Sequence, residues 1–283
     1  MAALGKANYL MKNITLGQYY PARSLMHRTD PRIKVLLAVL YIICATFLAK
    51  NVISFGLLLV SSVILIILSR IPLKTVFRSV TPVLFVMLFA SLFQIFGKSG
   101  EVPLVEWWII RIYPEGLYGA AFMIIRIFAL IVGTSIFLTY TTTPIELTDA
   151  IEDLLSPLRK IKVPVHDFAM MMTLALRFIP TLVDEADKIM TAQKARGADF
   201  STGSLVQRAK ALIPVLIPLI VSAFRHAVEL AVAMECRCYH GDGTRTRLTV
   251  RKCRFLDFVL LAVMVLFGAG LVVLNILKIG YTL

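Results

Sequence analysis

Charged residues are scarce in this sequence, and acidic residues are the scarcer kind. Asp, Glu, Lys and Arg make up 17% of the 283 residues, with 17 acidic against 30 basic side chains. A soluble domain is usually roughly a quarter charged, whereas 58% of this chain is hydrophobic and its mean hydropathy is +0.81. These apolar residues exceed what one soluble core needs, so we expect some of them to face lipid.

Several other signals are missing. The chain has four cysteines, three of them in a basic region that we expect in the reducing cytoplasm, so disulfides are not expected. Cys236, Cys238 and His240 lack the fourth ligand and the wider spacing of a usual zinc site, and we expect no metal. Residues 1–31 lack the apolar core of a cleavable signal peptide. HExxH and GxSxG motifs are absent, which disfavours an intramembrane enzyme.

Five apolar runs are long enough to cross a bilayer, which takes about 20 residues. They are residues 33–49, 52–69, 82–96, 116–140 and 255–277. Only Lys50 and Asn51 separate the first two runs, which predicts a tight helical hairpin. The amphipathic stretch IPLKTVFRSV precedes the third run.

Basic residues gather in the segments that this topology places on one side. Residues 1–34, 70–78 and 141–254 hold 25 of the 30 Lys and Arg residues, so we place them and the N-terminus in the cytoplasm, beside anionic lipid. No basic patch is interleaved with aromatic residues, and we expect no nucleic acid partner. We predict an all-α polytopic membrane protein whose parts are a four-span membrane domain (1–140), a cytoplasmic domain (141–253) and a fifth span with an external C-terminus (254–283).

The cytoplasmic domain contains two apolar stretches that run into charged helical sequence. FAMMMTLALRFIPTLV is interrupted by Arg177 and Pro180, and LIPVLIPLIVSAF is too short to span comfortably and carries two prolines. We interpret both as parts of long, partly interfacial helices. The alternative is that either stretch is a sixth span.

Capping signals predict three helices in this domain. Thr143 and Glu146 form a capping box with a proline between them at the first helical position. A second helix is expected from Asp167 to Arg196, with Gly197 as its left-handed stop. Another capping box at Ser204 opens a third helix, which is expected to run to about Tyr239.

The last two of these helices end alike. One ends in Lys194-Ala195-Arg196-Gly197 and the other in Glu235-Cys236-Arg237-Cys238. Either arginine alone can be read as a favourable charge at a helix C-terminus. Two such ends on consecutive helices favour a docking device, because an arginine fork binds a carboxylate through two hydrogen bonds.

Three segments resemble the transmembrane (T) component of energy-coupling factor (ECF) transporters, and the similarity covers nearly the whole chain. They are LGQYYPARSLMHRTDPRIK, LRFIPTLVDEADKIMTAQKARGADF and LIPVLIPLIVSAFRHAVELAVAMECRCYHGDG. The resemblance implies a non-catalytic coupling subunit that links two ABC-type ATPases to an exchangeable substrate-binding S component for uptake of vitamins or similar micronutrients. It implies no cofactor in this chain, with ATP and Mg bound by the ATPases, and a place in the bacterial cell membrane.

The resemblance also implies roles for individual residues. In the family, two Ala-Arg-Gly-type motifs end two crossing coupling helices and dock into the ATPases. Ala195, Arg196 and Gly197 match the first motif, whereas the second site keeps Arg237 between Cys236 and Cys238. Cys238 accepts a left-handed helix end less readily than glycine does. An S-component contact is expected on an adaptable face formed by Met170, Met171, Met172 and Ala175.

Arg126 lies within the fourth span, where a charge is costly and marks a functional candidate unless it pairs with backbone carbonyls or snorkels. The alternative function that we consider is an ion-coupled secondary carrier. Such carriers show internal repeats and polar groups at midplane, and here only Arg126 is available. The transported substrate is not named by this sequence.

Overall fold

The computed structural model describes residues 19–22, 24–97, 105–107, 110–200, 204–239 and 254–277. Contacts divide the chain into two compact units. The first, which we call the membrane unit, comprises Leu16–Ala150 and Thr249–Leu283. The second, which we call the coupling unit, comprises Ile151–Leu248 with Met1–Thr15.

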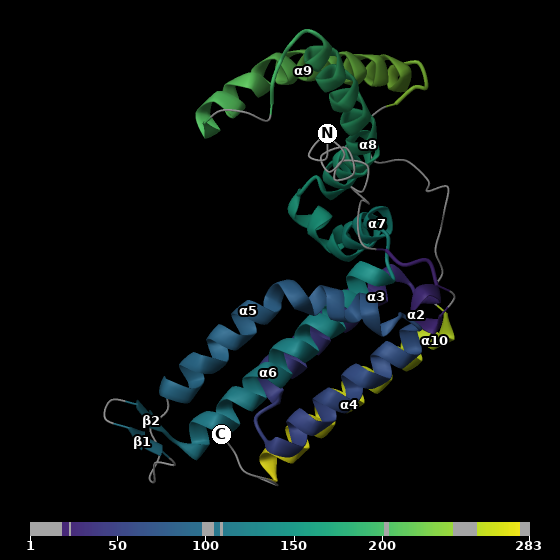
Figure 1. The fold of residues 1–283 in the computed structure, drawn as a ribbon. Helices are drawn as coiled ribbons and strands as arrows, with labels where there is room; N and C mark the ends of the chain where they lie inside the picture. Colours follow the sequence, from purple (N-terminus) through teal and green to yellow (C-terminus); the bar gives the residue numbers. More distant parts are fainter. Residues whose placement is uncertain are drawn as a thin grey trace. The chain divides into compact units, whose positions relative to one another are not determined.

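The membrane unit is built from long apolar helices that lie side by side (Figure 1). Its described elements are α2 (Leu25–Arg28), α3 (Pro31–Ile43) continued by the π-helical turn η1 (Cys44–Leu48), α4 (Val52–Ser69), α5 (Leu73–Gly97), α6 (Pro114–Thr134) continued by the π-helical turn η2 (Ser135–Tyr140), and α10 (Phe255–Ile276). Between α5 and α6, the short strands β1 (Val105–Trp107) and β2 (Ile110–Ile112) form an antiparallel hairpin. The predicted all-α polytopic architecture is confirmed apart from this hairpin.

All five predicted spans are helices long and apolar enough to cross a membrane. The second span has the predicted bounds, and the turn at Lys50 and Asn51 joins α3 to α4. The third span begins earlier than predicted, because the amphipathic stretch from Leu73 and the apolar run form one continuous helix with Pro82 inside it. A proline removes one backbone donor from a helix, and α5 tolerates that loss.

The core of the membrane unit centres on Tyr41, whose side chain is 1% exposed. Its hydroxyl shares a hydrogen bond with Ser62 of α4 at 3.0 Å, and its ring packs edge-on against Phe137 of η2. A Cβ atom built on Gly133 of α6 would overlap this ring. Glycine is therefore required there by the close approach of α3 and α6.

Arg126 points from α6 to the turn between α3 and α4. One of its terminal nitrogens donates to the Ala49 carbonyl at 2.8 Å, and the guanidinium carbon lies 5.2 Å from the centre of the Phe55 ring. Asn51 and Asn275 tie the same turn to α10, because each donates to a backbone carbonyl of the other's segment. Arg126 therefore pairs with a backbone carbonyl and an aromatic ring. Pairing with backbone carbonyls is the arrangement that we gave above as the alternative to a functional role for this residue.

The coupling unit contains most of the last third of the chain. Helix α7 (Pro144–Leu155) enters it and is followed by the 3-10 helix η3 (Ser156–Ile161), α8 (Val165–Ala195) and α9 (Leu205–Glu235). Both predicted capping boxes are present, at Thr143 with Glu146 and at Ser204 with Gln207. By length and composition, the stretch Val206–Glu235 of α9 is a sixth candidate span, so the alternative raised for this apolar stretch meets that criterion, whereas α8 is not among the candidates found in the described residues.

Candidate functional site

The first candidate motif forms the end of α8. The N–H of Gly197 donates to the Lys194 carbonyl at 3.0 Å, and the N–H of Ala198 donates to the Gln193 carbonyl at 3.0 Å. This pair of bonds defines a Schellman helix end. Gly197 occupies its left-handed position with φ +89°, as predicted, and Arg196 is the residue immediately before it.

The second candidate motif ends α9 in the same way. The N–H of Cys238 donates to the Glu235 carbonyl at 2.9 Å, and the N–H of Tyr239 donates to the Met234 carbonyl at 3.0 Å. Cys238 adopts φ +54°, so it takes the place that Gly197 has in α8. The sequence left the geometry of this end open. The structure shows that Arg237 has the same position relative to its helix end as Arg196 has.

All six residues of the two motifs are exposed: Ala195, Arg196, Gly197, Cys236, Arg237 and Cys238. Among the residues that the structure describes, neither guanidinium has an ion-pair partner. Each arginine is thus available to a carboxylate of another molecule, with the carbonyls of its helix end already partly satisfied within the chain.

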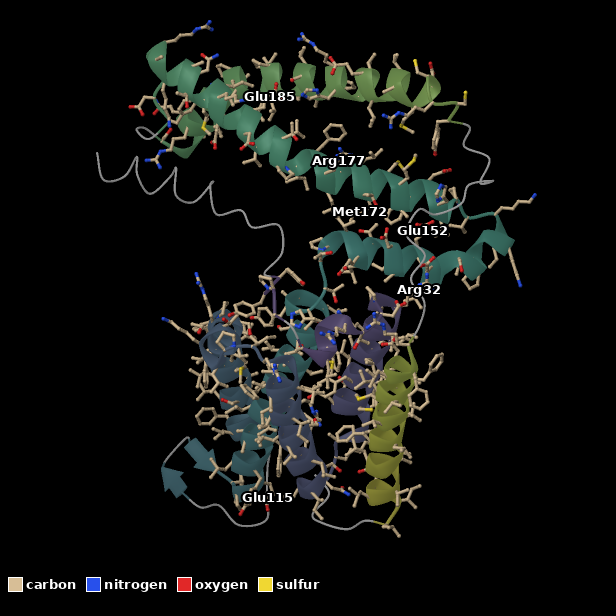
Figure 2. The ribbon with its side chains drawn as sticks, turned by 90° about the vertical axis from the view of Figure 1, so that its right-hand side faces the viewer. Arg32, Glu115, Glu152, Met172, Arg177 and Glu185 are labelled. Carbon is tan, nitrogen blue, oxygen red and sulfur yellow. The ribbon has the colours of Figure 1, made fainter. Side chains whose placement is uncertain are left out.

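Helices α8 and α9 are held together where they cross by a small polar cluster. Ser222 of α9 donates a short hydrogen bond to Glu185 of α8, which lies at this crossing (Figure 2). His226 approaches the second carboxylate oxygen of Glu185 at 3.6 Å, an ion-pair distance that is too long for a hydrogen bond. The His226 ring also stacks on Phe178 of α8 at 6.2 Å between centroids. The crossing therefore has both a polar and an aromatic contact.

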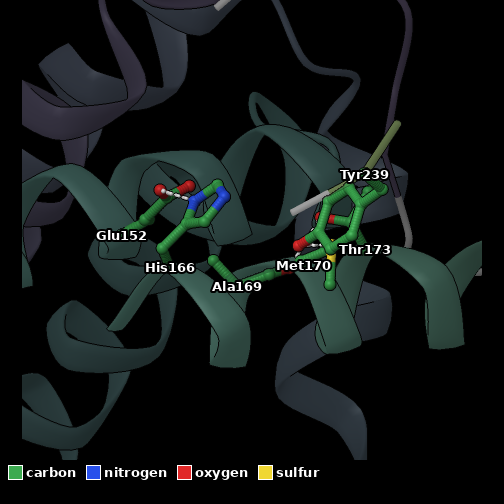
Figure 3. A network of polar contacts seen from close by, with 6 residues as sticks. All are labelled: Glu152, His166, Ala169, Met170, Thr173 and Tyr239. Atoms are coloured by element: carbon green, nitrogen blue, oxygen red, sulfur yellow. Dashed lines mark hydrogen bonds and ion pairs between the residues drawn. The ribbon is translucent and has the colours of Figure 1, made fainter. Parts of the chain in front are cut away.

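A second contact fixes the end of α9 near the start of α8. The Tyr239 hydroxyl donates to the Met170 sulfur at 3.0 Å (Figure 3). Met170 precedes Arg196 by 26 residues, which corresponds to roughly 40 Å along an α-helix at 1.5 Å per residue. The two arginines consequently lie at opposite ends of the crossed pair.

The start of α8 is also tied to α7. His166 and Glu152 form a contact of 3.0 Å between Nδ1 and Oε1, on the same stretch of α8 as Met170 (Figure 3). Both groups lie in the coupling unit. This link and the crossing cluster hold α7, α8 and α9 to one another.

The predicted methionine face is divided by the structure. Met171 and Met172 are 59% and 44% exposed, and Ala175 is exposed as well. Met170 is half-buried and accepts the Tyr239 hydrogen bond. The exposed part of the predicted S-component face is therefore formed by the other three residues.

From the sequence, Tyr239 was named only as a helix end, and Glu185 and Ser222 were not identified. A serine within an apolar stretch and a glutamate on the facing helix were visible signals for the crossing, but pairing them required the direction of α9 relative to α8. In the part of the chain that the structure describes, no group of three His, Cys, Asp or Glu residues could hold a metal ion. His240 lies outside that part, and Cys236 is a free thiol.

Comparisons with known proteins agree with this architecture. Residues 22–249 match the model of the CbiQ family, described as cobalt transport protein. The energy-coupling factor transporter transmembrane protein EcfT of Ruminiclostridium cellulolyticum is 51% identical over 249 residues, which cover 88% of this chain and 91% of that protein. The EcfT proteins of Clostridium kluyveri and Streptococcus equi subsp. equi are 47% and 44% identical, over 88% and 91% of this chain and 92% and 95% of those proteins. With membrane-spanning helices and relatives of this similarity, the chain belongs to the CbiQ family and is a transmembrane component of the EcfT type, part of an ECF transporter.

Proposed function

We propose that this chain is the coupling subunit that links two cytoplasmic ABC-type ATPases to an exchangeable substrate-binding S component. ATP and Mg are bound and ATP is hydrolysed in the ATPases, and this chain carries the resulting movement to the S component. The cargo is a vitamin or a similar micronutrient. The complex lies in the bacterial cell membrane with the N-terminus of this chain in the cytoplasm, a placement that the distribution of Lys and Arg supports.

The observation that carries the proposal is the pair of matching helix ends. Arg196 and Arg237 stand in the same Schellman geometry although their neighbours differ. Two alike but separate contacts suit two ATPase subunits, because each subunit can receive one arginine. A planar guanidinium that binds a carboxylate through two hydrogen bonds fixes direction as well as distance, which is what a contact that transmits movement requires.

The crossing cluster supports the same function. A movement applied at Arg196 reaches α9 only if the two helices turn together, and Glu185 with Ser222 and His226 ties them near their middles. On this proposal, the opening and closing of the ATPase pair turns α8 and α9 as one body.

The S component is proposed to contact the exposed part of the methionine face. Methionine packs adaptably against different partners, and Met171 and Met172 are accessible. Replacing both with glutamine should lower co-purification of the S component and leave the ATPases bound. Retention of both kinds of partner would remove the S component from this face.

The alternative function, an ion-coupled secondary carrier, depended on Arg126, and the contacts of this residue do not favour it. Arg126 is engaged by the Ala49 carbonyl and the Phe55 ring, so its presence in the fourth span is explained by the structure of the α3–α4 turn. No observation on the described residues favours an ion pathway over coupling to ATPases.

The direct test is affinity purification of the tagged chain in mild detergent. The wild type should bring down two ABC ATPases and a small membrane protein, and the Arg196→Glu, Arg237→Glu double variant should lose the ATPases. The matched control is Lys188→Glu with Arg208→Glu, which changes the net charge equally at exposed positions of α8 and α9 and should keep them. A wild-type chain that purifies alone, or a double variant that retains every partner, would contradict the proposal.

A further inference from the structure

The chain passes from one unit to the other within α7, where the boundary falls between Ala150 and Ile151. Just before α7 and its capping residue Thr143 lies a segment that we call the α7 root, Tyr140–Thr142, which begins with the last residue of η2. Its three residues are 1%, 2% and 3% exposed. Connecting segments usually run over a protein surface, so the burial of this one shows that the membrane unit encloses the start of the connection.

Several hydrogen bonds from different parts of the membrane unit hold the α7 root. The backbone N–H of Tyr20 donates to the Tyr140 carbonyl at 3.1 Å. The Tyr140 hydroxyl donates to the Thr75 carbonyl of α5 at 3.1 Å. The ammonium of Lys34, from α3, donates to the Thr141 carbonyl at 2.7 Å. The root is thus tied to three segments that are far apart in the sequence.

Lys34 is the unusual member of this set. It is 1% exposed, and an ammonium buried to that extent is costly unless other groups compensate it. Two carboxylates are buried in the same unit, Asp30 one turn before Lys34 and Asp257 at the start of α10, at 6% and 1% exposure. Asp257 accepts the backbone N–H groups of Asp30 at 3.3 Å and of Arg254 at 2.7 Å.

These contacts place Lys34 between the start of α3 and the segment that leads into α7. The Asp257 carboxylate joins the starts of α3 and α10, and the Lys34 ammonium binds the last segment before α7. A neutral donor would be less costly to bury, but a charged donor makes a shorter and stronger hydrogen bond to a carbonyl. A strong hydrogen bond is useful here, because the α7 root has to keep its position when force acts on α7.

We infer that Lys34 is a positioning residue for transport, which fixes the α7 root so that movement of α7 is passed to the membrane helices. Without its bond, the chain between η2 and α7 bends locally and absorbs the movement. This inference rests on the proposed function, because it requires that ATP hydrolysis drives the coupling unit. Lys34 touches neither substrate nor nucleotide in this account.

The test uses the complete complex in proteoliposomes and measures the substrate imported for each ATP hydrolysed. Lys34→Met keeps most of the unbranched side chain and removes its charge and its donor. Because one charge-assisted hydrogen bond is lost, we expect this ratio to fall about tenfold while the ATPase rate and the bound partners stay within about twofold of wild type. Lys34→Arg retains a charged donor and should recover part of the ratio. Lys74→Met, at an exposed lysine of α5, is the matched control and should leave the ratio unchanged.

Other outcomes overturn the inference. An unchanged ratio in Lys34→Met would do so, and so would a parallel fall of uptake and ATP hydrolysis, which is expected of a lysine that only stabilises the fold. The Thr142 hydroxyl also donates to the Phe137 carbonyl at 3.1 Å. If Lys34→Met does not assemble, Tyr140→Phe with Thr142→Val removes this bond and that of the Tyr140 hydroxyl to Thr75 without removing a charge. The same loss of ratio in that variant supports the inference, and a wild-type ratio overturns it. Absence of ATP-dependent uptake by the wild-type complex would instead overturn the proposed function itself.

Discussion

The left-handed residue at each coupling helix end gives a prediction whose sign differs between the two ends. An L-residue in this conformation costs roughly 1–2 kcal/mol, and glycine avoids that cost but loses about 0.5–1 kcal/mol through its greater backbone freedom in the unfolded state. Cys238→Gly should therefore stabilise the end of α9 by about 0.5–1 kcal/mol. By the same balance, Gly197→Ala should destabilise the end of α8 by about 0.5–1 kcal/mol.

Amide hydrogen exchange measures these local changes directly. The reporter in α9 is the N–H of Tyr239, bonded to the Met234 carbonyl at 3.0 Å, and the reporter in α8 is the N–H of Ala198. Because exchange of such groups follows local opening, a change of 1 kcal/mol alters its rate about fivefold. Exchange at Tyr239 should slow in Cys238→Gly, and exchange at Ala198 should become faster in Gly197→Ala.

The control for this experiment is Cys236→Gly, two residues before Cys238. Cys236 has φ −61°, a helical value at which glycine is the poorer residue by about 0.3 kcal/mol, so this variant should speed the exchange at Tyr239 slightly. Slower exchange in both cysteine variants, or no change in Cys238→Gly, would refute the argument that backbone strain at Cys238 limits the α9 end.

Two further predictions concern the membrane unit. Gly133→Ala should destabilise the chain by about 3 kcal/mol or more, because the new methyl group overlaps the buried Tyr41 ring. Gly56→Ala has open space around its Cβ and should stabilise α4 by about 0.5–1 kcal/mol, because alanine is the better residue within a helix. Melting temperatures in detergent compare the two, and equal values would contradict the packing. Arg126→Met should cost about 1–3 kcal/mol, because the Ala49 carbonyl loses its charged donor; an unchanged melting temperature would show that this bond contributes nothing.

Local sequence signals predicted the parts of the fold that depend on neighbours along the chain. The second span was predicted at its observed bounds, because the turn residues Lys50 and Asn51 precede it and Arg70 follows it. The capping boxes at Thr143 and Ser204 were likewise readable, since a cap involves residues only three positions apart. The start of α5 was placed too late, because hydropathy marks the apolar part of a helix and not its amphipathic first turns.

Contacts between distant segments were not predictable from these signals. Lys34 reads as one more cytoplasmic lysine, and its bond to the Thr141 carbonyl depends on how α3 packs beside η2. The position of Tyr239 on Met170 depends on the direction in which α9 crosses α8. For the candidate site, the sequence identified Arg196 and Arg237 through their spacing from the helix ends, and only the backbone geometry showed that the two ends are equivalent.

In the proposed function, this chain converts ATP hydrolysis by partner subunits into uptake through its two arginine-bearing helix ends. The most direct measurement is substrate uptake into proteoliposomes that contain the complete complex, with ATP or a non-hydrolysable analogue supplied to the ATPases and an ionophore present to collapse ion gradients. We expect uptake with ATP alone, unaffected by the ionophore, and its loss when Arg196 and Arg237 are both replaced by glutamate. Uptake that persists without ATP hydrolysis and stops when the ion gradient is collapsed would contradict it and support a secondary carrier.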